Sequence, residues 1–261
     1  MSLMRPIAQI VCLALAAAVL VTAQSAVAGS QYVILSTEPV VDELPPGKIF
    51  VPSDVINVPA GAVVTLLGED GSVNPISGPA ALVVTEDALK SDSPQRARDG
   101  QAGPSSLALI ASLLTNERRR TESIGSARTT ADQSKPSGLD DPWAISIEES
   151  APACIRNGEV VLARRGIGES VVFSVRLGSG QSFNGLVWSA GKPTYSLPNP
   201  IPAGVKSFIV ETRKTSALIE IKMFPQNAAL GNPLEVLGWM VRSGCKRQAL
   251  AFVHQLVTKQ Q

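Results

Sequence analysis

The hydrophobic residues of this chain follow three kinds of pattern: one unbroken apolar run, several short alternating segments and two segments with helical spacing. Alternation with a period of two predicts strands, and steps of three and four residues predict helices. Short strand patterns separated by Gly and Pro occupy 31–86 and 143–224. The chain is therefore predicted to be mainly β with helices, a β-rich α+β fold.

The unbroken apolar run lies near the N-terminus. Arg5 precedes it, Ile7–Val21 carries no charge, and Ala26–Ala28 supplies small residues at the positions that a signal peptidase recognises. This order predicts a signal peptide over 1–28, cleaved between Ala28 and Gly29. A retained N-terminal membrane anchor is the alternative, although a span needs about 20 apolar residues. We expect a periplasmic protein with no integral membrane span after cleavage.

A small β-module is predicted over 29–88. Asp70-Gly71 is a favoured hairpin dipeptide, and Gly78-Pro79 marks another turn. The strand candidates are Gln31–Leu35, Lys48–Val51, Asp54–Val58, Ala62–Leu67 and Ala81–Thr85.

The segment 89–141 does not show the strand patterns of the preceding module. Leu107, Ile110 and Leu114 have helical spacing and predict a helix over 105–120, which ends in the cationic residues Arg118–Arg120. From 121 to 141 the chain is polar, with almost no large apolar residue, and we expect a flexible linker.

The remainder, 142–261, is predicted to be an antiparallel β-sandwich-like domain with a C-terminal helix over 233–258. Asn232 is a candidate cap for this helix, and Gly244 is a point at which the helix could divide, since glycine costs about 1 kcal/mol in a helix interior. The strand candidates are Trp143–Ile147, Glu159–Ala163, Ser170–Leu177, Ser182–Trp188, Ser207–Thr212 and Ala217–Phe224.

Two cysteines remain once the signal peptide, which contains Cys12, is removed. In an oxidising compartment, Cys154 and Cys245 are most simply paired in a disulfide. Such a bond would tie the C-terminal helix to the start of the C-terminal domain. Two free buried thiols are the alternative.

No combination of residues predicts a catalytic, cofactor or metal site. His254 is the only histidine, and no strand-turn-helix serine motif accompanies it. Gly166–Gly168 and Gly178–Gly180 precede strand patterns rather than helices, which favours turns over phosphate loops. The pairs Asp140–Asp141 and Glu148–Glu149 point to opposite faces of an extended chain, so neither pair forms a site by itself.

Charge balance and aromatic content restrict the classes of molecule that the chain could bind. Lys and Arg total 23 against 22 Asp and Glu, and aromatic residues make up 4% of the chain, a composition that argues against nucleic acid. Arg164 and Arg165 beside a turn, together with Trp188 and Tyr195, are the candidate interaction surface. The run Arg118–Arg120, with Arg128 nearby, is interpreted as a solvated helix end, with an acidic partner or lipid headgroup as the alternative.

The segments Val58–Leu67, Asp70–Ser72 and Gly78–Pro79 together resemble the sequence pattern of the FecR-type β-module. Leu186–Trp188, Pro202–Gly204 and Phe208–Val210 look like parts of a fibronectin-III or Ig-like domain. The layout is similar to that of uncharacterised exported proteins of Gram-negative bacteria. FecR proteins proper carry a membrane span, and this chain has none beyond its N-terminal run.

We therefore expect a non-catalytic binding protein or a protein that interacts with an unknown envelope partner. An accessory or sensor component of a FecR-like surface-signalling system is the alternative that the resemblance implies. A hydrolase is the third hypothesis, and it would require Asp140, Asp141 or Glu148 to join other acids in a cleft.

Overall fold

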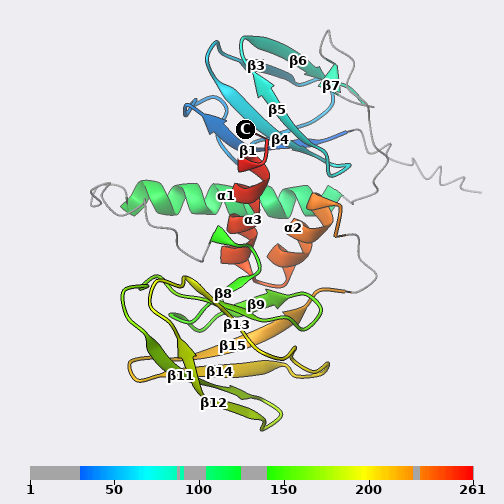
Figure 1. Cartoon of the computed structure of the whole chain (residues 1–261). Helices are drawn as coiled ribbons and strands as arrows, with labels where there is room; N and C mark the ends of the chain where they lie inside the picture. The colour runs from blue at the N-terminus through cyan, green and yellow to red at the C-terminus, as the bar shows by residue number, and fades with distance from the viewer. Residues whose placement is uncertain (1–29, 87–88, 91–103, 125–139, 226–229, 261) are drawn as a thin grey trace, which may run out of the picture.

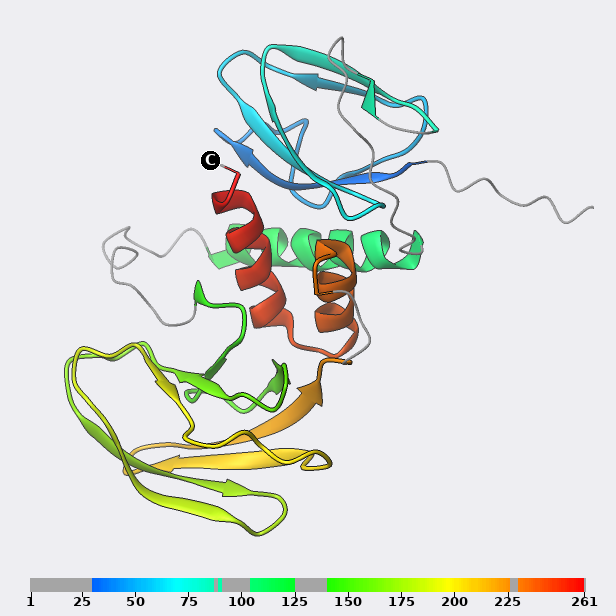
Figure 2. The ribbon, with the colours of Figure 1, turned by 45° about the vertical axis from the view of Figure 1, so that its right-hand side comes forward.

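The structure is a computed structural model that describes residues 30–86, 89–90, 104–124, 140–225 and 230–260. The predicted signal peptide with its cleavage site, Arg128 and most of the predicted linker lie outside the described residues. Three helices lie between two groups of strands in the part that is described (Figures 1 and 2). We call these parts the N-terminal unit (30–90), the helical layer and the C-terminal unit (140–225).

The N-terminal unit consists of two sheets around one apolar core. The first sheet has the order β2-β1-β4-β5 and the second has the order β3-β6-β7, with every pairing antiparallel. The strand bounds are β1 Tyr32–Glu38, β2 Ile49–Phe50, β3 Val55–Val58, β4 Val63–Gly68, β5 Val73–Ser77, β6 Ala80–Val84 and β7 Leu89–Lys90.

Strand β1 is buried on both faces, which explains its continuous apolar sequence. Tyr32 and Ile34 point into the core of the N-terminal unit, whereas Val33 and Leu35 belong to a second core, which they share with the helices. On β4, Leu66 likewise belongs to the core of the N-terminal unit, and Leu67 belongs to the core shared with the helices. One face of the first sheet therefore supports the helical layer.

The helical layer is formed by segments that are far apart in sequence: α1 Pro104–Ile124, α2 Pro233–Arg242 and α3 Lys246–Thr258. Leu107, Ile110 and Leu114 are buried against α2, α3 and β1, as their spacing predicted. Helix α1 continues past 120, so Arg118–Arg120 do not lie in its last turn. The prediction of a helix end there is wrong because the helix continues through polar residues as far as Ile124.

The single C-terminal helix predicted over 233–258 is two helices. Gly244 has φ +81°, a left-handed conformation that ends α2, and α3 begins two residues later. Asn232 caps α2, with its Oδ1 accepting from the N–H groups of Leu234 and Glu235. The apolar faces of both helices pack on α1 and the N-terminal unit as well as on the C-terminal unit, because one core includes residues of all three parts.

The C-terminal unit has a five-stranded sheet of order β12-β11-β14-β15-β9 and a three-stranded sheet of order β13-β10-β8. Residues of both sheets line one apolar core that includes Phe173, Trp188 and Phe208. The strand bounds are β8 Ala144–Ser146, β9 Pro152–Ile155, β10 Val161–Ala163, β11 Val171–Leu177, β12 Ser182–Trp188, β13 Thr194–Ser196, β14 Ser207–Thr212 and β15 Ser216–Met223.

The C-terminal unit is not purely antiparallel, which corrects the prediction. Strand β10 pairs in parallel with β8, and β15 pairs in parallel with β9. The chain leaves the smaller sheet after β8, adds β9 to the edge of the larger sheet and returns as β10, so β8 and β10 run in the same direction. Strand β9, which contains Cys154, was not predicted, because its four residues show too short a pattern.

Candidate functional site

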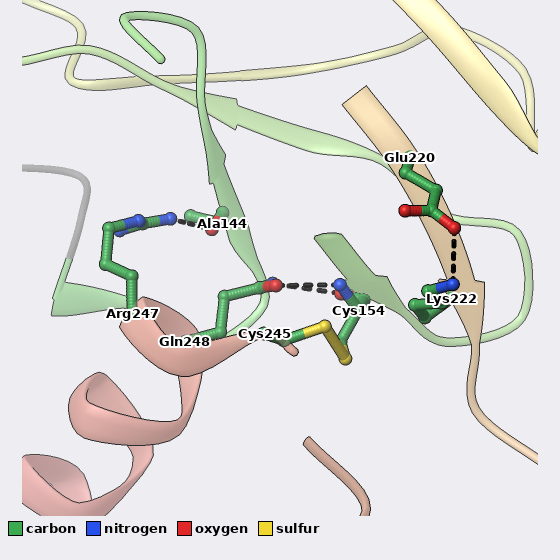
Figure 3. The surroundings of a disulfide bond; sticks show 7 residues. All are labelled: Ala144, Cys154, Glu220, Lys222, Cys245, Arg247 and Gln248. Atoms are coloured by element: carbon green, nitrogen blue, oxygen red, sulfur yellow. Dashed lines mark hydrogen bonds and ion pairs between the residues drawn. A yellow bond between two sulfur atoms is a disulfide. The ribbon is translucent and has the colours of Figure 1, made fainter. Parts of the chain in front are cut away.

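The disulfide lies where the helical layer meets the C-terminal unit. Cys154 is on the edge strand β9 and Cys245 directly precedes α3, and both residues are buried. Their sulfur atoms are 2.08 Å apart and their Cα atoms 5.9 Å apart (Figure 3). The pairing expected from the sequence is thus present, and it joins residues separated by 91 positions.

Gln248, in the first turn of α3, makes a second connection at the same place. Its Oε1 accepts from the Cys154 N–H at 2.7 Å, and its Nε2 donates to the Cys154 carbonyl at 2.9 Å (Figure 3). In a parallel pairing, alternate residues direct both backbone groups away from the partner strand. Gln248 therefore occupies the place of a further strand at the edge of the five-stranded sheet, and it is only 3% exposed.

Arg247 extends the connection to the smaller sheet. Its Nη2 donates to the carbonyl of Ala144 on β8 (Figure 3). Burial lowers the pKa of Arg247, and the carboxylate of Glu149 counteracts part of this effect. The first turn of α3 thus binds both sheets of the C-terminal unit through side chains that sequence analysis did not single out. A Gln and an Arg in an amphipathic helix normally indicate its solvated face.

An aromatic cluster lies at the same junction between the helical layer and the C-terminal unit. The Phe224 ring lies 4.9 Å from that of Trp239 and 6.1 Å from that of Trp143, edge to face in both pairs. The Arg156 guanidinium lies over the Trp143 ring, 5.3 Å from its centroid. Two of the three tryptophans of the chain therefore stabilise the contact between α2 and the C-terminal unit.

Replacing Gln248 with alanine is expected to lower the free energy of unfolding by about 1–3 kcal/mol, because the Cys154 N–H and C=O lose their partners in a buried place. Urea unfolding followed by tryptophan fluorescence measures the change. Gln255→Ala on the same helix is the control, because the Gln255 side chain forms no hydrogen bond within the described residues, and it should change stability by less than about 0.5 kcal/mol. Equal effects of the two changes would contradict the edge-capping role.

The predicted interaction surface does not form as expected. Arg165 is exposed, but Arg164 is 4% exposed, Trp188 is fully buried and Tyr195 is half-buried. The structure does bring three of the four together: the Arg164 guanidinium lies 5.0 Å from the centroid of the Trp188 ring, which lies 5.8 Å from that of Tyr195. The aromatic rings belong to the core of the C-terminal unit, and the prediction was wrong because a strand pattern does not show which end residues turn inward.

The loops above Trp188 are held together by hydrogen bonds. The indole Nε1 donates to the Lys192 carbonyl at 2.9 Å. The Gly191 N–H donates to the Ile167 carbonyl at 2.7 Å, and the Ala190 N–H donates to the Ser170 hydroxyl at 3.1 Å. The loops 164–170 and 189–193 therefore form one end of the C-terminal unit, and the side chain of Arg164 is buried there.

The paired carboxylates have structural partners. Glu148 accepts from the Arg165 N–H at 2.7 Å and lies 3.5 Å from the Arg165 Nε. Asp141 accepts from the Trp143 N–H at 2.9 Å. His254 is exposed on α3, and Gly166–Gly168 and Gly178–Gly180 lie between strands, as their sequence contexts predicted.

Within the described ranges, no group of three or more His, Cys, Asp or Glu residues could hold a metal ion. Among the helices that the structure places, none has the length and hydrophobicity required to cross a membrane. Comparisons with family models, curated proteins and solved structures find no match for this chain.

Proposed function

We propose that this chain is an exported, non-catalytic protein of the bacterial periplasm that binds a partner in the cell envelope. The observation that carries the proposal is the shared core. Val33 and Leu35 of the N-terminal unit, the three helices, and Cys154 and Phe224 of the C-terminal unit all belong to it. Such a core holds two β units in one fixed arrangement, with their outer sheet faces directed away from each other (Figure 1).

The outer faces supply binding surface. Val172 and Val187 are opposite each other on β11 and β12 and are 50% and 57% exposed. Val55 and Val83 form a similar pair on the outer sheet of the N-terminal unit, at 52% and 44%. Contiguous exposed apolar patches mark sites of protein contact, and these two cross-strand pairs are the positions that we propose for such a site on each outer face.

The proposal extends to the kind of domain that each β unit forms. The segments that resemble the FecR-type module fall in succession on β4, on the turn that follows it and on the turn before β6. The two sheets of the C-terminal unit, which share a core, support a sandwich-like domain. Both observations are compatible with a sensing or docking role that requires rigid presentation of loops.

Two measurements test the proposal. Mass spectrometry of the protein from the periplasmic fraction of a Gram-negative host should give a mature N-terminus at Gly29, and retention in the cytoplasm would contradict export. A photo-crosslinker at Val187 or Val83 should give a discrete adduct with an envelope protein, whereas the same group at Ser179, in an exposed turn, should not. Turnover of a small substrate, lost on Asp141→Asn or Glu148→Gln, would instead support the hydrolase.

A further inference from the structure

Arg164 directs a charged side chain into the end of the C-terminal unit. It follows β10 directly, and its backbone N–H donates to the Pro193 carbonyl at 3.2 Å. Successive residues of an extended chain alternate between faces, so Arg164 lies on the same face as Leu162, which is fully buried in the core. The result is an arginine residue that is only 4% exposed, with its guanidinium over the Trp188 ring.

The guanidinium is only partly satisfied. Of its five N–H donors, those on Nη2 reach one acceptor, the Ser189 carbonyl, at 3.0 Å. The Nε atom is fully covered and has no hydrogen-bond partner among the described residues. The nearby carboxylate of Glu148 pairs with Arg165 and not with Arg164.

A buried charge normally has a partner of opposite charge, because desolvation disfavours the charged form. The aromatic face and a single carbonyl offset only part of that cost. Burial lowers the pKa of Arg164, with no carboxylate contributing in the opposite direction. Among the described residues, no negatively charged acceptor is thus placed at the edge of the guanidinium, where its N–H groups point.

We propose that Arg164 anchors a binding site for a small oxyanion, a carboxylate or phosphate group, at the end formed by the loops 164–170 and 189–193. Arginine binds both groups through two parallel N–H donors. The loops are already tied together by the Gly191–Ile167 and Ala190–Ser170 bonds. Lys192, exposed on the second loop, adds a further cation, and the side-chain positions of Gly166 and Gly168 are open space. The inference goes beyond the proposed function and does not depend on it.

The competing explanation is that Arg164 only covers the Trp188 ring. The two explanations differ in what an anion does. If Arg164 only covers the Trp188 ring, an anion should not change the stability of the protein. If Arg164 belongs to a binding site, the bound anion stabilises the folded protein by RT ln(1 + [L]/Kd).

Thermal unfolding of the full mature chain distinguishes them. We expect the Tm to rise in a saturable way with inorganic phosphate or with acetate, at an ionic strength held constant with NaCl. Arg164→Met should abolish the rise, and Arg165→Gln, which changes the adjacent exposed arginine, should retain it. The more effective of the two anions identifies the group. A response that persists in Arg164→Met, or no response to either anion in the unmodified protein, overturns the proposal.

An NMR measurement covers the case in which Arg164→Met fails to fold. The Nε–H resonance of Arg164, assigned by its disappearance in Arg164→Lys, should shift on titration with the effective anion, while that of Arg165 stays in place. An Arg164 resonance that does not move while other signals do would place the anion elsewhere and overturn the inference.

Discussion

Replacing Cys154 and Cys245 together with serine is expected to lower the free energy of unfolding by about 2–5 kcal/mol, because the open chain gains conformational entropy when a long loop is released. The two residues are separated by 91 positions, and the bond joins β9 to the start of α3. Urea unfolding of the oxidised protein and of the double variant measures the difference.

Two controls isolate the bond from the side chains. The unmodified protein unfolded in the presence of a reductant should approach the stability of the double variant, and the double variant should not respond to the reductant. Since Gln248 still binds β9 in the variant, the native fold is expected to persist at low denaturant. Identical midpoints for the oxidised protein and the variant would show that the disulfide does not stabilise the junction.

Local pattern predicted much of this fold. The alternation in 170–177 and 217–224 gave β11 and β15 nearly to the residue, and the spacing of Leu107, Ile110 and Leu114 gave the buried face of α1. These elements could be predicted because one buried face is sufficient to define them. The disulfide could be predicted because only two cysteines lie outside the segment that is predicted to be a signal peptide.

The contacts between distant segments could not be predicted in the same way. An apolar helix stripe shows that a face is buried but not what covers it, so the packing of α2 and α3 on α1 and β1 was missed. Gln248 and Arg164 have ordinary polar sequence contexts, and only the fold turns them inward. Strand direction was missed for the same reason, since β8 and β9 pair in parallel with β10 and β15, which are not the strands that follow them directly.

The net charge of the whole chain also concealed how unevenly the charges are distributed along it. The whole chain has a net charge of +1, but residues 30–86 contain a single basic residue, Lys48. The acidic residues of that segment are Glu38, Asp42, Glu43, Asp54, Glu69, Asp70 and Glu86. The helices that support the N-terminal unit carry an excess of Lys and Arg, so the net charges of the two layers are opposite in sign.

Two turns of the N-terminal unit allow the contact with the helical layer to be tested by a matched pair of substitutions. Lys48 N–H donates to the Pro45 carbonyl, and Ala62 N–H donates to the Pro59 carbonyl, so both turns have the same hydrogen bond. Each has glycine at the third position with positive φ, +88° at Gly47 and +78° at Gly61. Only the first turn lies against α1.

Gly47→Ala is expected to lower the free energy of unfolding by about 2–5 kcal/mol, and Gly61→Ala by about 1–2 kcal/mol. Both changes impose the strain of a left-handed alanine. At Gly47 the new Cβ would also lie 2.6 Å from the Thr115 Oγ1 and 2.7 Å from the Ala111 carbonyl oxygen, whereas at Gly61 it meets no atom within 4 Å. A helix backbone cannot move aside as a side chain can, so the first turn must separate from α1.

Urea unfolding compares the two variants, and hydrogen exchange at the amides of α1 should accelerate in Gly47→Ala alone. Equal losses of stability with unchanged exchange in α1 would mean that the N-terminal unit does not rest on the helical layer in solution.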